Sequence, residues 1–328
     1  HIEMPLKGKN PIQIRKNSSR LAELIAAERV DIIHARSRAP AWSALHAAQK
    51  TGCHFITTFH GAYGTSGSLK RRYNAVMTKG ELVIANSEFT ANHIMHTYPM
   101  EQKNLRVIRR GVDISIYNPG AVTQARVIQL AGQWRLPDGK SVIMLPGRLT
   151  AWKGHRVLLD ALTHLTRDDY VVVFVGDEQG RAEYRHQLER QVEQNDLGHI
   201  VRFAGPCRDM PAAYMSADVV VSASTKPEAF GRVIVEGQAM GRPVVAFDHG
   251  GAKETILGGE TGLLVEPGNA AELAQALGAA LDLGAERRKS MAEGAIRHIA
   301  ENFTLEKMCA STLAVYEEVL AAGAPGER

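Results

Sequence analysis

The sequence lacks the features of membrane-spanning, disulfide-rich and cysteine-rich zinc proteins. Among its 328 residues, no run approaches the ~18 consecutive apolar residues that a transmembrane helix needs. Its three cysteines, Cys53, Cys207 and Cys309, stand far apart and form no Cys-x-x-Cys pair. This spacing argues against a disulfide framework and is typical of a reducing compartment, so we expect a cytoplasmic protein.

Motifs of several common enzyme classes are also absent from the sequence. It contains no Gly-x-Ser-x-Gly nucleophile elbow, no Gly-x-Gly-x-x-Gly fingerprint and no Gly-x4-Gly-Lys-Ser/Thr loop. These absences argue against a hydrolase of the elbow type, an NAD-dependent enzyme and a P-loop protein. His93 and His96 have a spacing that could bind metal on a helix, but no carboxylate or cysteine pattern accompanies them. We therefore predict no metal site.

Aromatic residues are sparse at 6%, whereas glycine occurs 30 times, a combination that favours α/β architecture. The net charge of +4 conceals an asymmetry along the chain. Up to Gly120, 17 Lys and Arg against 8 Asp and Glu give +9, and the remaining 22 against 27 give −5. The clusters Arg15-Lys16-Arg20 and Lys70-Arg71-Arg72 favour an anionic partner, such as phosphate, an acidic glycolipid or a membrane surface, over a merely solvated surface. No nucleic-acid-binding motif accompanies the charge, so we expect no nucleic-acid partner.

Short β-branched runs alternate with amphipathic helical segments along the first part of the chain. Asn17 or Ser18 is predicted to cap the first helix, with Leu21, Leu24 and Ile25 on its apolar face. Further helices are predicted near residues 39–50, in the 70s and over 88–97. The strands predicted here span residues 30–33, 55–59, 82–85 and 105–108. Such alternation predicts a parallel sheet with helices on both faces.

A second alternating set follows a predicted linker near residues 112–122. Its predicted strands span residues 141–145, 170–175, 200–204, 219–222, 243–247 and 262–265. The tail from about residue 269 to about residue 321 is predicted to be helical. The uninterrupted apolar run at 171–175 is typical of a strand buried on both faces. The fold class is therefore α/β, with two Rossmann-like, doubly wound parallel-sheet domains.

The two predicted sets are unequal, with four strands in the first and six in the second. The chain opens with His1 in mid-pattern, and residues 4–6 look like the end of a strand. We therefore expect that the first domain lacks an opening strand-helix-strand stretch of roughly 50–60 residues. The alternative is a small native first domain that starts at Met4.

The segment at 226–236 is the most informative for chemistry. It follows a strand, passes through Gly231 and enters a predicted helix, with Glu228 and Glu236 about two turns apart. The free backbone N–H groups and the positive end of a helix starting after Gly231 would form an anion site. Both carboxylates are expected to face the same crevice.

A second anion-binding pattern follows the predicted strand at 141–145. Gly147 and Arg148 come directly after this strand, and Lys153 follows within the same loop. Sheets of this class bind ligands at the carboxyl ends of their strands. We therefore predict that Arg148 and Lys153 neutralise a diphosphate and stabilise the charge that develops on it as a leaving group.

Together these segments resemble the retaining glycosyltransferases of family 4, which have the GT-B fold. The resemblance rests on Gly-Arg-Leu-x4-Gly at 147–154, Glu-x7-Glu at 228–236 and Gly-Gly-Ala-Lys-Glu at 250–254. Thr-Phe-His-Gly at 58–61 and Val-Ile-Arg-Arg-Gly-Val-Asp at 107–113 are also similar to that family. The resemblance covers essentially the whole chain. Within the family, the enzymes of bacterial lipopolysaccharide or capsule synthesis are the nearest subgroup.

The resemblance implies roles for the residues that match the family motifs. Glu228 matches a residue near the donor sugar that is implicated in catalysis, and Glu236 matches one that holds the donor ribose hydroxyls. Arg148 and Lys153, which follow Gly147, match the clamp on the diphosphate.

Further positions match the donor turn, the base pocket and the first domain. Phe230, Gly231, Arg232 and Val233 match a turn whose backbone amides meet the sugar and the phosphate. Cys207 matches a position that borders the nucleotide base. His60 matches a residue of the first domain that reaches the transferred sugar across the cleft between the domains.

The sequence departs from the family pattern at two points. The family's opening strand ends in a glycine-rich loop that helps to bind donor phosphate and acceptor, and this loop is absent here, as the expected truncation implies. Gly237 replaces the commoner alanine after Glu236, which weakens the helix by up to ~1 kcal/mol but leaves the carboxylate in place. The first departure concerns donor and acceptor binding, and the second concerns helix stability alone.

The resemblance implies a metal-independent, retaining glycosyltransferase without a bound cofactor. Its co-substrate is expected to be a nucleotide-diphosphate sugar, a UDP-sugar in preference to a GDP-sugar, and its acceptor an anionic glycolipid or saccharide precursor. Peripheral contact with the inner face of the cytoplasmic membrane is expected as well. The predicted domains are residues 1–118, residues 119–303 and a helix at 304–328 that crosses back to the first domain.

Two alternatives stay open at this point. One is a sugar-nucleotide epimerase or phosphorylase of the same fold, although no motif for a pyridoxal-phosphate lysine is evident. The other is a non-catalytic module whose basic half binds a membrane surface.

Overall fold

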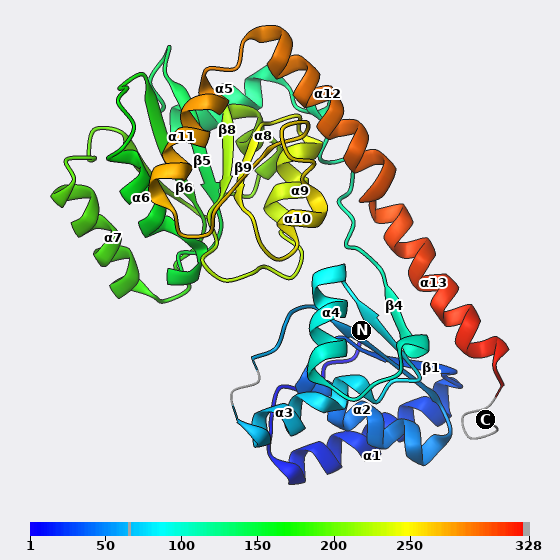
Figure 1. Ribbon diagram of the computed structural model, residues 1–328. Helices are drawn as coiled ribbons and strands as arrows, with labels where there is room; N and C mark the ends of the chain where they lie inside the picture. The colour runs from blue at the N-terminus through cyan, green and yellow to red at the C-terminus, as the bar shows by residue number, and fades with distance from the viewer. Residues whose placement is uncertain (65–66, 324–328) are drawn as a thin grey trace. The chain divides into compact units, whose positions relative to one another are not determined.

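The chain folds into two compact units (Figure 1). A computed structural model describes residues 1–64 and 67–323. Unit 1 contains residues 1–110 together with the chain from Glu306 onward, and unit 2 contains residues 111–305. Within the described residues, none of the helices combines the length and apolar character needed to span a bilayer.

Unit 1 is built on a four-stranded parallel sheet with the strand order β1-β2-β3-β4. Its strands are β1 (Ile32–Ala35), β2 (His54–Phe59), β3 (Leu82–Ala85) and β4 (Leu105–Val107). Its helices are α1 (Pro11–Glu28), α2 (Arg38–Thr51), α3 (Ser68–Asn74), η1 (Ala75–Thr78), α4 (Glu88–Thr97), η2 (Gln102–Asn104) and α13 (Leu305–Ala321).

Side chains alternate along β2 between the two faces of this sheet, because successive residues of a strand point to opposite sides. Phe55 and Phe59 pack with α2, η1 and α4 on one face. Ile56 packs with Val315 and Val319 of α13 on the other face. The prediction of helices on both faces is confirmed, and the last helix supplies the second layer.

The first helix begins earlier than predicted. Asn10 is its N-cap, since the side chain accepts a hydrogen bond from the backbone N–H of Ile12 at 2.9 Å, and Pro11 occupies the first helical position. Asn17 and Ser18 lie inside the helix and are buried, so the prediction that one of them caps it is wrong. Proline at the first position is a start signal that outweighs an internal polar pair.

Unit 2 contains a six-stranded parallel sheet with the strand order β10-β9-β8-β5-β6-β7. The order reverses between β5 and β8, so this sheet is doubly wound. Its strands are β5 (Ser141–Pro146), β6 (Tyr170–Val175), β7 (Val201–Gly205), β8 (Val219–Ser222), β9 (Val244–Phe247) and β10 (Leu263–Val265). Its helices are η3 (Pro119–Ala121), α5 (Gln124–Gln133), η4 (Ala151–Lys153), α6 (His155–Leu162), α7 (Ala182–Gln194), α8 (Met210–Ser216), α9 (Arg232–Ala239), α10 (Ala252–Thr255), α11 (Ala270–Leu281) and α12 (Ala285–Asn302).

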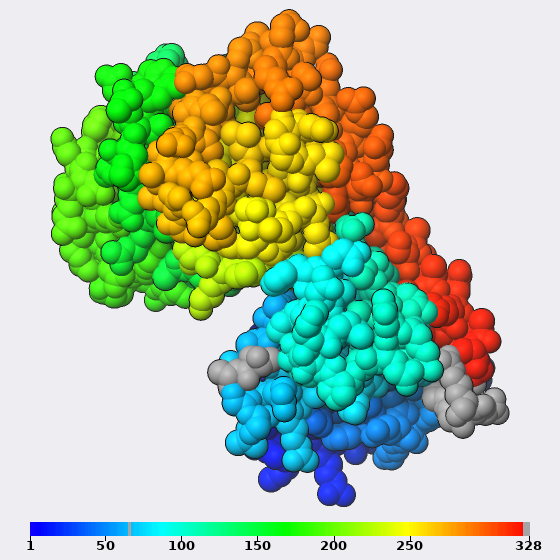
Figure 2. Space-filling model, in the orientation of Figure 1, coloured from blue at the N-terminus to red at the C-terminus, as the bar shows by residue number. Residues whose placement is uncertain are grey.

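The two faces of this sheet carry separate apolar cores. Val172 and Phe174 pack with residues of α6, α7 and α11, whereas Val171 and Val173 pack with α8 and α9. α11, coloured orange, lies beside the green α6 on the surface of unit 2 (Figure 2). Burial of β6 on both faces is therefore confirmed. Every strand of the two alternating sets is present, with ends that differ from the prediction by at most two residues. The interpretation of residues 4–6 as the end of a strand is wrong, because they precede α1 without belonging to any strand.

The segment predicted as a linker is anchored in unit 2. The backbone N–H of Val112 donates to the Phe303 carbonyl at 2.8 Å, and Val112 itself is buried. A Cβ on Gly111 would lie 2.2 Å from the Thr304 carbonyl oxygen, so this contact requires glycine. The units therefore divide after residue 110 and after residue 305, whereas the sequence predicted divisions after 118 and 303.

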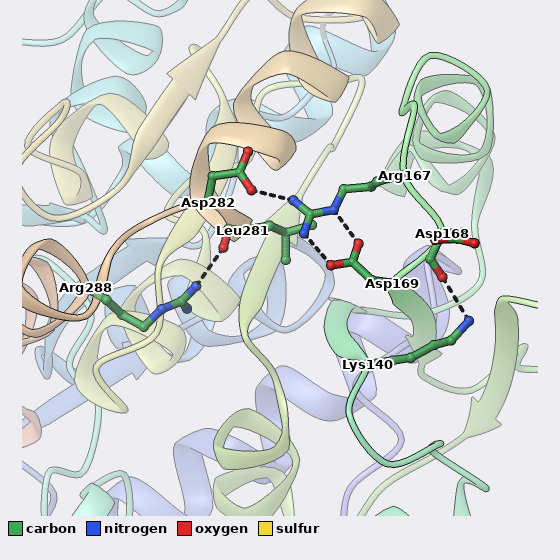
Figure 3. Close-up of polar contacts among 7 residues, drawn as sticks. All are labelled: Lys140, Arg167, Asp168, Asp169, Leu281, Asp282 and Arg288. Carbon is green, nitrogen blue, oxygen red and sulfur yellow. Dashed lines mark hydrogen bonds and ion pairs between the residues drawn. The ribbon is translucent and has the colours of Figure 1, made fainter.

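A network of charged side chains lies at the amino ends of β5 and β6 in the unit 2 sheet (Figure 3). Arg167 binds both carboxylate oxygens of Asp169 at 2.6 Å and also Asp282 at 2.7 Å. Next to it, Lys140 donates to the backbone carbonyl of Asp168 at 2.8 Å. These hydrogen bonds with Arg167 hold the pKa of Asp169 below its usual range. The network ties the loop before β6 to the end of α11.

We expect Arg167→Met to lower the melting temperature by roughly 1–3 °C near neutral pH, because exposed ion pairs contribute little. Asp169 has a lowered pKa, so its contribution is present above its unfolded pKa and disappears as the pH falls through the folded value. The difference between variant and wild type should therefore shrink as the pH falls below about 4. Thermal denaturation from pH 3 to pH 7 measures this. Arg190→Met, which removes one longer contact with Glu183, is the control, and an equal shift in both variants would contradict the prediction.

Candidate active site

The reversal of strand order in unit 2 places the ends of β5 and β8 side by side. β5 pairs with β8 through Ile143 and Met144. Open α/β sheets bind ligands in the crevice outside the carboxyl ends of strands at such a switch point. The loop after β5 carries Arg148 and Lys153, and the loop after β8 carries Glu228. The two sequence patterns therefore meet at one place in the fold.

Lys153 and Glu228 form the central ion pair of this crevice. Lys153 Nζ lies 2.7 Å from Glu228 Oε1, and the Ser224 hydroxyl donates to the same oxygen. The two charged side chains are only 12% and 17% exposed. Lys153 also lies over the Trp152 ring, 4.5 Å from its centre. The pair therefore places one carboxylate and one amino group together at the carboxyl ends of β5 and β8.

Glycines allow the loops that carry this pair to approach each other. Gly154 has φ +77°, and a Cβ there would lie 1.7 Å from the carbonyl oxygen of Ala223. On the other side, the backbone N–H of Gly251 donates to the Glu228 carbonyl at 2.8 Å. The loop of Glu228 is thus held from both sides by backbone contacts.

Arg148 extends from the same β5 loop and is exposed. Its guanidinium donates to the Gln179 side chain at 3.2 Å, in the loop after β6. Gly147 has φ +155°, and its N–H donates to the Val175 carbonyl at 2.8 Å. The loop after β5 is therefore anchored on the end of β6 and on the loop that follows it.

Glu236 is the buried carboxylate of α9. Its Oε2 accepts from the Tyr214 hydroxyl at 2.8 Å, and its Oε1 accepts from Arg232 at 2.8 Å. Burial and the nearby Glu236 raise the pKa of Tyr214 well above its ordinary value, so this tyrosine remains a donor. Burial, with Glu236 next in effect, raises the pKa of Tyr117 to about 12.

The turn before α9 has the predicted form. Gly231 adopts φ +84° and precedes the helix, whose first N–H groups have no partner within the helix. Phe230 is a core residue, because its ring packs 5.9 Å from that of Phe303. The Val233 side chain packs on the α8 and α9 core. Only the backbone of Phe230 and Val233 is therefore available for the role that the resemblance implies.

Cys207 follows β7, at the same edge of the sheet but with β6 between its strand and β5. It is half-buried against the apolar core of α8, and burial raises the pKa of its thiol. A neutral thiol in this position suits contact with an uncharged ring rather than with phosphate.

His60 lies in unit 1, at the end of β2. Arg36 Nε donates to His60 Nε2 at 3.1 Å, and burial, with Arg36 next in effect, lowers the pKa of His60 to about 4. The imidazole is therefore neutral at pH 7. It borders a cavity of about 570 Å³ within unit 1 that is also lined by His34 and Tyr316.

Several residues of these clusters were missed by the sequence interpretation: Ser224, Tyr214, Tyr117, Arg36 and His34. His34 binds the Tyr316 hydroxyl and the Thr58 hydroxyl, each at 2.7 Å. Its place near the end of β1, next to β2 with His60, is a signal that the sequence contained. The sequence around Tyr214 and Tyr117 contains no pattern that predicts their place beside Glu236, because Glu236 lies far from both in the sequence.

No group of three or more His, Cys, Asp or Glu side chains that could hold a metal ion occurs in residues 1–64 and 67–323. His96 contacts the Asn92 carbonyl at 2.7 Å, one turn back in its own helix. The predicted independence from metal stays a prediction.

Comparisons with known proteins extend this description. Residues 128–298 match the model of glycosyl transferases group 1, and residues 1–116 match that of glycosyltransferase family 4. A D-inositol 3-phosphate glycosyltransferase from Jonesia denitrificans is 31% identical over 253 residues, which is 75% of this chain. The chain spans about three fifths of that relative's length (59%).

Solved structures agree with the two-domain architecture. A glycosyltransferase from Rickettsia africae ESF-5 is 38% identical with a TM-score of 0.91, over 98% of this chain and 85% of that one. Alr3699/HepE from Anabaena, solved in complex with UDP, is 26% identical with a TM-score of 0.82, over 93% of this chain and 82% of that one. The predicted fold class, GT-B with two parallel-sheet domains, and the resemblance to family 4 are thereby confirmed. The group 1 model covers more than half of the residues, and the chain belongs to the family of glycosyl transferases group 1.

Proposed function

We propose that this chain is part of, or is itself, a retaining glycosyltransferase that transfers a sugar from a nucleotide diphosphate to an acceptor hydroxyl. The Lys153–Glu228 pair at the β5/β8 switch point carries the proposal. It places an amino group and a carboxylate together at the carboxyl ends of β5 and β8, in the loop that leads to the turn before α9. A donor that is anionic at its diphosphate and electron-poor at its anomeric carbon needs both charges.

The cations of the crevice act on the leaving group. Arg148, Lys153 and the backbone amides after Gly231 bind the diphosphate and stabilise the charge that develops as the bond to the sugar breaks. Because these groups supply the positive charge, no divalent ion is needed. The β-phosphate then leaves from the face that the acceptor attacks, which gives retention.

Glu228 acts on the sugar. Its carboxylate positions the sugar and stabilises positive character at the anomeric carbon. Retaining glycosidases place two carboxylates on opposite sides of one bond, with one as nucleophile. Here the ammonium group of Lys153 and the hydroxyl of Ser224 already bind Glu228 Oε1, so we do not assign Glu228 as a covalent nucleophile.

The donor is proposed to be a UDP-sugar. Structures of Alr3699/HepE were solved with UDP and with UDP-glucose, and that protein is 26% identical to this chain. Glu236 would hold the ribose hydroxyls, and the neutral thiol of Cys207 would border the base. A carboxylate such as Glu236 can accept hydrogen bonds from ribose hydroxyls, and a neutral thiol such as Cys207 can pack against an uncharged base.

The acceptor is proposed to be an anionic glycolipid or saccharide precursor, bound from unit 1. The charge of +9 up to Gly120 supports an anionic acceptor. Names of relatives point the same way, since inositol 3-phosphate carries a phosphate. The neutral His60 would donate or accept a hydrogen bond at the transferred sugar. We place the reaction in the cytoplasm, at the inner face of the membrane.

The first test concerns the donor. Calorimetry is expected to show binding of a nucleoside diphosphate, and Arg148→Ala and Lys153→Ala should each weaken it by about 1–3 kcal/mol. Lys153→Ala should have the larger effect, because it leaves the charge of Glu228 uncompensated. Lys140→Ala is the control, because Lys140 lies at the amino end of β5, the opposite end of the strand from Arg148 and Lys153. Absence of binding to UDP, GDP, ADP and TDP at millimolar concentration would contradict the proposal.

The second test concerns metal. Turnover with the donor identified by calorimetry should persist in EDTA, because protein cations neutralise the diphosphate. The release of nucleoside diphosphate is measured with and without chelator, and magnesium is then added back. Activity that is lost on chelation and restored by magnesium or manganese would refute the metal-independent mechanism.

The third test concerns the membrane. Lys70, Arg71 and Arg72 are exposed on α3 beside Leu69, which is 83% exposed. Each cation near an anionic bilayer adds roughly 1 kcal/mol, and the effect fades within a Debye length of about 8 Å at physiological salt. Sedimentation should therefore show binding to anionic vesicles that weakens steeply with salt. Replacing the three cations by alanine should reduce it at least tenfold without changing nucleotide affinity.

The matched control replaces three exposed cations of unit 2, Arg190, Arg287 and Lys289, by alanine. Equal recovery with neutral and anionic vesicles at low salt would show that the α3 cations only solvate a helix. Vesicle binding in a chain that binds no nucleotide would instead favour the non-catalytic module.

A further inference from the structure

The two oxygens of Glu236 are unequally occupied. A carboxylate offers about four lone-pair positions, two on each oxygen. Arg232 donates twice to Oε1, from Nε at 3.2 Å and from Nη2 at 2.8 Å. Tyr214 donates once to Oε2 at 2.8 Å. One lone-pair position, on Oε2, is therefore left, whereas the two hydroxyls of a ribose would need two positions to donate to.

The two partners of Glu236 differ in how firmly they are held. Tyr214 is fully buried, and its hydroxyl has no alternative position without loss of packing. The Arg232 side chain is 61% exposed, although the carboxylate that it binds is only 9% exposed. The guanidinium is thus open to solvent and to a ligand anion, and a ribose hydroxyl that donates to Glu236 would replace the hydrogen bond that Arg232 gives up. Arg232 is therefore the partner that a ligand can displace.

The position of Arg232 is not explained by helix stability. It is the first residue of α9, where a cation opposes the positive end of the helix dipole. The same turn is the one whose amides are proposed to meet the donor diphosphate. A cation that weakens the helix start would strengthen an anion site there.

We propose that Arg232 is a displaceable guanidinium that couples ribose binding to diphosphate binding. In the donor-free chain it covers Glu236 Oε1. When a donor binds, the guanidinium turns to the diphosphate and leaves Oε1 to accept a ribose hydroxyl. This inference rests on the proposed nucleotide-sugar site and adds a role for the Arg232 side chain.

The coupling has a distinct thermodynamic signature. A nucleoside without phosphate must displace Arg232 from Glu236 and offers it no new anion. A nucleoside diphosphate offers both a diol and an anion, so the two halves of the ligand favour each other's binding. Removal of the guanidinium should therefore affect the two ligands in opposite directions.

The test measures two affinities by calorimetry. UDP, GDP, ADP and TDP are titrated into the wild-type chain, and the best of them and its nucleoside are then titrated into Arg232→Met. The nucleoside diphosphate affinity should fall about tenfold, the effect of one charge-assisted hydrogen bond. The nucleoside affinity should rise severalfold, because Glu236 Oε1 can then accept a ribose hydroxyl without displacing Arg232. Arg185→Met is the matched control, because Arg185 pairs with Glu189 at the same spacing on α7 and should alter neither affinity.

Circular dichroism and the melting temperature establish that the variants are folded. If Arg232→Met is unstable, Arg232→Lys replaces it; lysine keeps the charge but lacks the fork, so nucleoside binding should again be strengthened. An equal loss for both ligands, or an unchanged diphosphate affinity, would overturn the coupling and leave Arg232 as a helix-surface residue. Failure of the wild-type chain to bind any of the four diphosphates would overturn the proposed function as well.

Discussion

The adjacency of β5 and β8 is the constraint on which the candidate site depends. Because the strand order reverses there, the loop after β5 and the loop after β8 leave the sheet side by side and turn to opposite faces. Lys153 and Glu228 are 75 residues apart in sequence but meet at 2.7 Å. The contact of Gly154 with the Ala223 carbonyl sets how near these loops come, and any side chain at this glycine would separate them. The charged network of Figure 3 lies at the opposite end of these strands, because Lys140 and Asp169 directly precede β5 and β6.

Both carboxylates of the crevice are largely removed from water and carry partners. A buried carboxylate without a partner would be strongly disfavoured, which explains why Ser224 and Tyr214 supply hydroxyls in addition to the cations. Each hydroxyl donates to one carboxylate oxygen and so satisfies one of its lone pairs. The site is thus stable without ligand and still presents negative charge to a hydroxyl or an electron-poor carbon.

The strands of the fold were predictable from the sequence, because continuous apolar runs such as 171–175 identify buried parallel strands without any knowledge of their neighbours. That the loops after β5 and β8 meet was also predictable, because the carboxyl ends of parallel strands lie at one end of a sheet. The roles of Arg148, Lys153, Glu228 and Glu236 rest on the family resemblance and stay predictions. Contacts between distant segments were not predictable. Val112 pairs with Phe303, and Tyr214 reaches Glu236 across 22 residues, and no local pattern predicts either contact. The start of α1 was missed for another reason: two competing cap signals lie seven residues apart.

Glu228 and Glu236 differ in whether a bound ligand can displace their ion-pair partners. The partner of Glu228 comes from a loop that is fixed by backbone contacts at both ends, so the Lys153–Glu228 geometry persists unless the sheet itself changes. The partner of Glu236 comes from one turn away on the same helix, and its side chain can rotate while the backbone stays in place. A ligand would therefore meet a rigid charge pair at Glu228, the proposed sugar end, and an adjustable one at Glu236, the proposed ribose end. Rigidity belongs where charge develops during a reaction, because preorganised groups need no reorganisation at that moment. Adjustability belongs where a ligand is first recognised, since a pair that opens only for the complete ligand discriminates against its fragments.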